Sequence, residues 1–185
     1  MNDEIRNTNL NRNILIIDDS GIESRIYKDD LTLYSNFNLS VEICNSVKTF
    51  TEYISSDKSW DIILLDMMMP SEEIFSEDQS KNGQITGYLV AIEIRKVLHG
   101  TPIILLSNAP FENVKDYCQQ VESKITNCLF WVKNQMPPRK LATLLDKYFI
   151  EGRIEKPSES LLARIFGAML LQPNIGGVGL DIKEL

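Results

Sequence analysis

Acidic, hydroxyl and basic side chains stand at the ends of four apolar segments of the sequence. Asp18 and Asp19 follow the first segment, and Asp66 follows the second. Ser107 and Lys133 come directly after two later ones. Carboxylates, a hydroxyl and an ammonium are groups that bind a divalent cation and phosphoryl oxygens. If the four segments end side by side, these residues form one reactive site.

We assign the role of nucleophile at this site to Asp66. Neighbouring carboxylates repel and raise one another's pKa unless a cation lies among them, and Mg²⁺ prefers oxygen ligands. A carboxylate that is ionised at neutral pH needs no general base, so phosphoryl transfer to it requires positioning and charge neutralisation. Lys133 supplies a point charge for one phosphoryl oxygen, and Ser107 a hydrogen bond to another.

The apolar segments have the length and composition of β-strands. Four are continuous runs rich in branched residues, and a fifth alternates apolar and polar residues as an edge strand does. The continuous runs are 14–17, 62–65, 103–106 and 129–132, and the alternating one is 41–44. Amphipathic helical patterns separate and follow these segments.

The helices are predicted from caps and spacing. Ser20 and Glu23 form a capping box at the start of the first helix, in which Ile22 and Ile26 recur at helical spacing. Further helices are expected near 47–55, 86–98 and 111–124, and a last one opens at Pro137 and Pro138 with an apolar face of Leu141, Leu144, Leu145, Tyr148 and Phe149. Strand and helix thus alternate five times, which predicts an α/β fold with a doubly wound parallel sheet and helices on both faces. Ligands bind such sheets at the carboxyl ends of the strands.

Two segments do not fit this alternation. Residues 71–83 are polar and acidic, and we predict an inserted loop there. Residues 153–185 contain a further amphipathic helix, whose apolar stripe must be covered by the domain itself, by a second copy or by a downstream protein, and we favour the last two. The stripe is formed by Leu161, Leu162, Ile165, Phe166 and Met169. We therefore divide the chain into a flexible N-terminus at 1–11, a domain at 12–152 and a C-terminal extension.

Composition excludes several classes of protein. The chain has 19 basic and 26 acidic residues and a net charge of -7, so it lacks a broad basic surface for nucleic acid. Its three cysteines have no paired spacing, which indicates neither a disulfide framework nor a zinc site. No apolar leader or membrane span is recognisable. We expect a cytoplasmic protein without nucleic-acid or membrane partners.

The site residues resemble those of response-regulator receiver domains of two-component signalling, the chemotaxis-regulator-like family. Asp18-Asp19 follow an apolar strand, and Asp66-Met67-Met68-Met69-Pro70 matches the family's D-x-x-M-P pattern. Ser107 follows the fourth strand and Lys133 follows Phe130. The resemblance spans residues 12–152 and implies a five-stranded sheet in the order 2-1-3-4-5. It also implies a phosphoprotein that receives its phosphoryl group from a histidine kinase or phosphotransfer protein.

The resemblance implies a role for each of these residues. Asp66 would accept the phosphoryl group, and Asp19 and Asp66 would bind Mg²⁺ together with the Met68 backbone carbonyl. Asp18 would hold the metal mostly through water. Ser107 and Phe130 would be switch residues whose movement changes the surface around the fifth strand. We expect no enzymatic activity beyond self-phosphorylation and self-dephosphorylation, and an output through protein–protein contacts.

Three departures from the family pattern leave an alternative open. Asn108 stands where a small residue is usual, Asn134 stands where proline is usual, and about a dozen extra residues precede Gly87, which corresponds to the glycine that opens the family's third helix. The alternative is a phosphorylation-independent interaction or dimerisation module.

Two further classes of protein fit the sequence less well. A haloacid-dehalogenase-type phosphatase needs a second acid where Met68 stands, and a flavodoxin-like carrier needs a Ser/Thr-rich phosphate loop after the first strand.

Overall fold

The computed structural model of the protein describes residues 10–108, 121 and 123–153. Five parallel strands form one sheet in the order β2-β1-β3-β4-β5. The strands are β1 (Asn11–Ile17), β2 (Asn38–Cys44), β3 (Ile62–Asp66), β4 (Ile103–Ser107) and β5 (Cys128–Val132). The predicted fold class and strand order are confirmed. The order reverses at β1 and β3, so the carboxyl ends of these two strands flank the point where such folds bind ligands.

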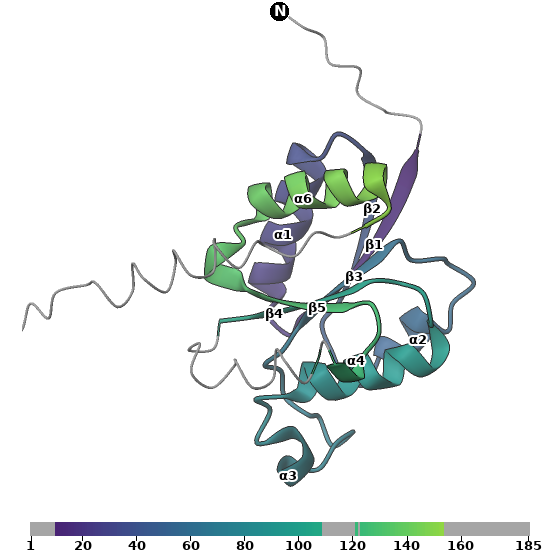
Figure 1. The fold of residues 1–185 in the computed structure, drawn as a ribbon. Coiled ribbons are helices and arrows are strands. Elements are labelled where there is room, and N and C mark those ends of the chain that lie inside the picture. Colours follow the sequence, from purple (N-terminus) through teal and green to yellow (C-terminus); the bar gives the residue numbers. More distant parts are fainter. Residues whose placement is uncertain (1–9, 109–120, 122, 154–185) are drawn as a thin grey trace, which may run out of the picture. The chain divides into compact units, whose positions relative to one another are not determined.

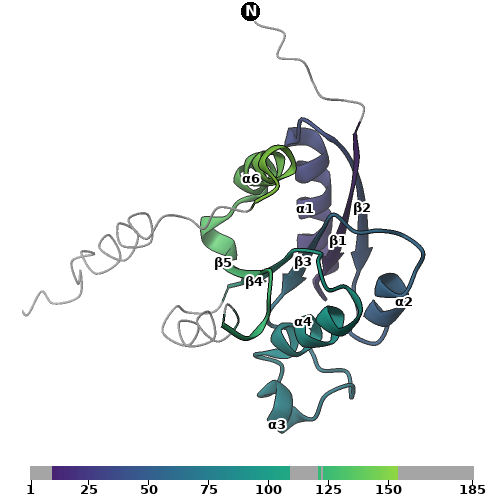
Figure 2. The ribbon, with the colours of Figure 1, turned by 45° about the vertical axis from the view of Figure 1, so that its right-hand side comes forward.

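Helices cover both faces of the sheet, as Figures 1 and 2 show. The helices are α1 (Gly21–Tyr34), α2 (Phe50–Ile54), α3 (Glu77–Ser80), α4 (Thr86–Val97) and α6 (Pro138–Glu151), with a 3-10 turn, η1, at Lys133–Gln135. α1 and α6 pack against one face, and α2 and α4 against the other. The predicted helix at 111–124 lies almost wholly outside the described residues.

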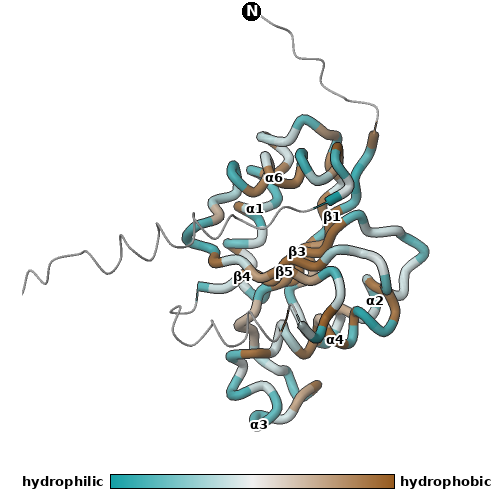
Figure 3. The backbone as a smooth tube through the Cα atoms, viewed as in Figure 1, coloured by the Kyte–Doolittle hydropathy of each residue, from teal (hydrophilic) through white to brown (hydrophobic). Residues whose placement is uncertain are grey.

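The sheet separates two apolar layers. Leu15, Ile63 and Leu105 point toward α2 and α4, whereas Ile14, Ile62 and Ile104 point toward α1 and α6. β3 and β4 are buried along their full lengths. Figure 3 shows the apolar strands at the centre between more polar outer surfaces. Burial on both faces is the reason that these strands appear in the sequence as continuous apolar runs.

α1 begins at the predicted cap but buries a different face from the one marked by its isoleucines. Ser20 is the N-cap, and its hydroxyl accepts a hydrogen bond from the Glu23 backbone N–H at 3.2 Å. Ile22 and Ile26 are 76% and 50% exposed. The buried residues are Ser24, Tyr27 and Leu31. The helix is oriented by Tyr27 and Leu31, which are four residues apart and pack against the sheet.

Asp146 of α6 fixes the end of α1. Its carboxylate is buried and accepts hydrogen bonds from the Ser35 hydroxyl at 2.5 Å, the Asn36 backbone N–H at 2.8 Å and the Asn36 amide at 2.9 Å. α6 itself ends at Gly152, which adopts a left-handed conformation with φ of 71°. Leu141 and Leu145 of its predicted apolar face are buried, and Leu144, Tyr148 and Phe149 are partly buried.

The prediction that residues 71–83 form only a loop is wrong, because the segment contains α3. Ser76 caps this helix, and Gln79 completes a capping box, with Ser76 N–H donating to the Gln79 side chain at 3.0 Å. The segment is also bonded to the rest of the fold. Glu72 accepts hydrogen bonds from the Ser46 hydroxyl and the Lys48 backbone N–H. The insertion is thus attached to the loop between β2 and α2.

Other predictions fall on residues outside the described ranges. These are the flexible N-terminus up to residue 9, the third cysteine Cys118, and the apolar stripe from Leu161 to Met169 in the extension. Cys44 and Cys128 are buried, as expected. Among the described residues, no helix has both the length and the apolar composition needed to cross a membrane.

Candidate functional site

The carboxyl ends of four strands bring the predicted site residues to one edge of the sheet. Asp18 follows β1, Asp66 ends β3, Ser107 ends β4, and Lys133 follows β5. All four are buried, with exposed fractions of 3%, 8%, 0% and 8% in that order. Asp19 is exposed beside them. Because the strands are parallel and adjacent, their ends converge, as the sequence predicts.

Three carboxylates form a cluster at this edge. One oxygen each of Asp18, Asp19 and Asp66 lies within 4.8 Å of the other two. Hard divalent cations such as Mg²⁺ take oxygen ligands and retain water or phosphate in their remaining positions. The donor set therefore fits Mg²⁺. The carboxylates come from the ends of two neighbouring strands, β1 and β3.

Lys133 is the basic partner of this cluster. Its Nζ lies 3.0 Å from Asp18 Oδ2 and 3.2 Å from Asp66 Oδ1, which links β5 to both acidic strand ends. A third carboxylate, Glu23 Oε2 on α1, lies 2.8 Å away. The Lys133 side chain is only 7% exposed, so these contacts are shielded from water.

Burial, aided by the charge of Asp18, raises the pKa of two carboxyls of the cluster, Asp66 and Asp19. Desolvation, together with the charge of Asp18, raises the pKa of Asp66 to about 7, against the opposing effect of Lys133. The pKa of Asp19 is also raised, first by burial and then by Asp18. Burial lowers the pKa of Lys133, but its carboxylate partners outweigh burial and raise it overall. Lys133 therefore stays charged, and one ammonium is too little to keep every carboxylate ionised. The expectation that Asp66 is ionised at neutral pH thus requires a cation in the cluster.

Gly87 allows α4 to pack directly against the end of β3. A Cβ atom at this position would lie 2.0 Å from the Asp66 backbone oxygen and 2.8 Å from the Met67 Cα. The Gly87 backbone N–H donates to the Met67 carbonyl at 3.0 Å. Met68 is 42% exposed, and its backbone hydrogen-bonds to the Asp66 carboxylate. The backbone after the phosphoacceptor candidate is therefore held by the helix that follows the insertion.

The predicted switch residues lie on β4 and β5. Ser107 is fully buried and lies opposite Val132 in the register of the two strands. Phe130 is partly buried and packs on the layer that contains α2 and α4. The roles of both residues in switching remain predictions.

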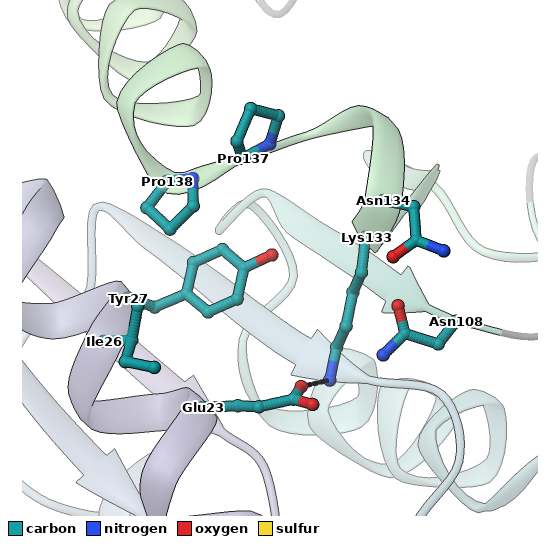
Figure 4. A pocket seen from close by; sticks show the side chains of 8 residues that line it. All are labelled: Glu23, Ile26, Tyr27, Asn108, Lys133, Asn134, Pro137 and Pro138. Atoms are coloured by element: carbon teal, nitrogen blue, oxygen red, sulfur yellow. Dashed lines mark hydrogen bonds and ion pairs between the residues drawn. The ribbon is translucent and has the colours of Figure 1, made fainter.

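A hollow of about 180 Å³ lies beside Lys133, between α1 and the start of α6. Asn108 and Asn134, the two departures from the family pattern, line it together with Glu23 and Lys133 (Figure 4). Among the described residues, Glu23 is the site residue with a charge that the sequence analysis missed. The sequence predicts a capping box that gives Glu23 a local role, but in the structure the Ser20 backbone N–H donates to Asp18 and the Glu23 carboxylate accepts a hydrogen bond from Lys133, 110 residues away in the sequence.

Solved structures with a similar fold include response regulators and receiver domain proteins. The response regulator DrrB of Thermotoga maritima matches with a TM-score of 0.56 and 14% identity over 78% of this chain. A CheY-like receiver domain protein of Methanospirillum hungatei matches with 0.56 and 18% over 77% of this chain and 96% of its own. RcsB of Salmonella typhimurium matches with 0.60 and 20% over 88% of this chain and 72% of its own.

These similarities establish the receiver fold. The chain spans 55% of the length of DrrB. Protein-family models and curated protein sequences give no match.

Proposed function

We propose that this chain, which has the receiver fold, accepts a phosphoryl group on Asp66 from a phosphohistidine of a histidine kinase or phosphotransfer protein. The observation that carries the proposal is the convergence of Asp18, Asp19 and Asp66 on one another and of Lys133 on Asp66. A nucleophilic carboxylate, a cation site and a fixed ammonium are the groups that phosphoryl transfer to an aspartate requires.

In the proposed reaction, a carboxylate oxygen of Asp66 attacks the phosphorus in line with the P–N bond of the phosphohistidine. That bond breaks, its electron pair returns to the imidazole ring, which takes up a proton, and an acyl phosphate forms on Asp66. The Lys133 ammonium and the Ser107 hydroxyl would bind phosphoryl oxygens. Mg²⁺, held by Asp18, Asp19, Asp66 and the Met68 carbonyl, would supply the neutralisation of charge.

The proposal includes a strict need for a divalent cation. Without a cation, the charges of Asp18, Asp19 and Asp66 repel the incoming phosphoryl group, and the Asp66 carboxyl, with a pKa of about 7, is about half protonated at pH 7. We therefore expect phosphorylation to stop when the cation is chelated.

We further propose that phosphorylation is read by protein partners in the cytoplasm. Ser107 would move toward the phosphoryl group and Phe130 would change rotamer, which alters the surface around β5. The apolar stripe of the extension, Leu161, Leu162, Ile165, Phe166 and Met169, would contact a downstream protein or a second copy. Deletion of residues 155–185 should then change the molar mass in solution or abolish partner binding. An unchanged monomer with intact binding would remove this part of the proposal.

Incubation with Mg²⁺ and acetyl phosphate tests the central part of the proposal. Intact mass spectrometry should show one added phosphoryl group on the wild-type chain, and none after chelation of Mg²⁺ or in the Asp66→Asn variant. Asp18→Asn and Lys133→Ala should slow the reaction without removing the acceptor. If the wild-type chain takes up no phosphoryl group, the alternative of a phosphorylation-independent interaction module replaces the proposal.

Beryllofluoride provides a second test that needs no reaction. It stands in for a phosphoryl group, and the DrrB receiver domain, which has the same fold over 77% of this chain, is described as BeF₃-activated. We expect this anion to bind here only in the presence of Mg²⁺ and an intact Asp66.

A further inference from the structure

Glu23 supplies a fourth carboxylate to the site and lies outside the cluster of three. It is the third residue of α1, where its side chain is expected to accept a hydrogen bond from the Ser20 backbone N–H. That N–H instead donates to Asp18 Oδ1 at 2.8 Å. The Glu23 carboxylate accepts a hydrogen bond from Lys133 Nζ at 2.8 Å, drawn as the dashed line in Figure 4. The Glu23 side chain therefore contacts the Lys133 ammonium instead of the Ser20 backbone N–H.

The Lys133 ammonium already has a carboxylate for each of its donors. A lysine ammonium carries three N–H groups. In the described part of the chain, Asp18, Glu23 and Asp66 lie 3.0, 2.8 and 3.2 Å from it. A phosphoryl oxygen on Asp66 can therefore gain a hydrogen bond from Lys133 only by displacing or sharing one of these contacts.

Glu23 is the carboxylate that competes with the phosphoryl oxygen most directly. Asp18 and Asp66 belong to the cluster that fits a cation, and a bound cation withdraws their charge from Lys133. Glu23 is not in that cluster and keeps its full charge at the shortest of the three distances. Its side chain is 43% exposed, compared with 4% for Asp18 and 9% for Asp66, so it has room to turn into solvent.

We propose that Glu23 is a positioning residue that draws Lys133 toward α1 and so limits how tightly the site holds a phosphoryl group on Asp66. The inference rests on the proposed function, and it assigns Glu23 the role of limiting phosphoryl binding at the same site. Removal of the Glu23 charge frees one donor of Lys133 for a phosphoryl oxygen. The site then binds a phosphoryl group, or its beryllofluoride analogue, more tightly than the wild-type site does.

Calorimetric titration of the full chain with beryllofluoride at saturating Mg²⁺ tests this inference. Glu23→Gln keeps the shape of the side chain but loses the charge, and we expect it to bind beryllofluoride roughly two- to tenfold more tightly than the wild type. Glu23→Asp keeps a negative charge at the start of the helix but is one methylene shorter, so it should show most of the same gain. Asp29→Asn removes a charge from the exposed side of α1 and should bind as the wild type does.

A titration with Mg²⁺ alone separates this role from a structural one. The positioning role predicts that Glu23→Gln binds Mg²⁺ no more tightly than the wild type while it binds beryllofluoride more tightly, whereas local damage to α1 weakens both. Equal or weaker beryllofluoride binding by Glu23→Gln overturns the inference, as does an equal gain in Asp29→Asn or wild-type behaviour of Glu23→Asp. If the wild-type chain itself binds no beryllofluoride, the proposed function fails and this inference fails with it.

Discussion

Asp66→Asn should make the folded chain more stable at high pH, because the wild-type carboxyl is held where its charge is unfavourable. The pKa of Asp66 is about 7 in the folded chain and about 3.9 in an unfolded one. Between these two values the folded chain holds a proton that the unfolded chain has released. Wild-type stability therefore falls as the pH rises through this interval, and asparagine removes the effect.

The size of this effect follows from the two pKa values. A difference of about three pKa units corresponds to roughly 4 kcal/mol at a pH above both values. We expect the free energy of unfolding of Asp66→Asn to exceed that of the wild type by about 2–4 kcal/mol more at pH 8 than at pH 4.

Urea unfolding followed by circular dichroism, with a chelator present, measures this difference. Asp29→Asn, which removes a charge from an exposed position, should show no such dependence on pH. Addition of Mg²⁺ should stabilise the wild type but not Asp66→Asn, by about 2.7 kcal/mol at a hundredfold excess over the dissociation constant. A stability difference that is the same at both pH values, or a less stable variant at high pH, would refute the account of a strained acidic cluster.

Three further predictions concern the frame of the site. Gly87→Ala should lower the free energy of unfolding by at least about 2 kcal/mol, since its Cβ meets backbone atoms, whereas Gly100→Ala, with nothing within 4 Å, should cost less in the same urea measurement. Asp146→Ala should cost about 2–3 kcal/mol in thermal unfolding because it removes the buried carboxylate that accepts hydrogen bonds from Ser35 and Asn36 directly after α1. The pKa of Glu72 is lowered, chiefly by a serine hydroxyl, so its contribution is present at neutral pH and is lost as the pH falls below the usual glutamate value. Hydrogen-exchange protection of the Lys48 amide should fall in the same way, and Glu72→Gln should remove that dependence on pH.

The strands were the most predictable part of this molecule, whereas their order followed from the resemblance to receiver domains. Continuous apolar runs can be buried on both faces only in a covered parallel sheet, and β3 and β4 are buried throughout. The start of β1 was less predictable. It begins at Asn11, before its apolar residues, because backbone pairing with β2 extends through the polar residues Arg12 and Asn13. Hydrogen bonding between backbones leaves no mark on side-chain composition.

The acidic site was predictable because its residues mark strand ends, but its finer arrangement was not. The sequence places Asp18, Asp66 and Lys133 at one edge without giving the burial and the distances that make Asp66 hard to ionise. The contact of Glu23 with Lys133 was not predicted, because the predicted capping box already explained a glutamate at this position. The short helix α3 left a recognisable signal, Ser76 followed three residues later by Gln79, which the acidic composition of the insertion obscured.

The most direct measurement of the central claim is the position of the phosphoryl group after reaction with acetyl phosphate and Mg²⁺. Borohydride reduces an aspartyl phosphate to homoserine, and peptide mass spectrometry then locates the converted residue. The account predicts homoserine at position 66 alone. Homoserine at position 18 or 19, or none anywhere in the chain, would contradict it.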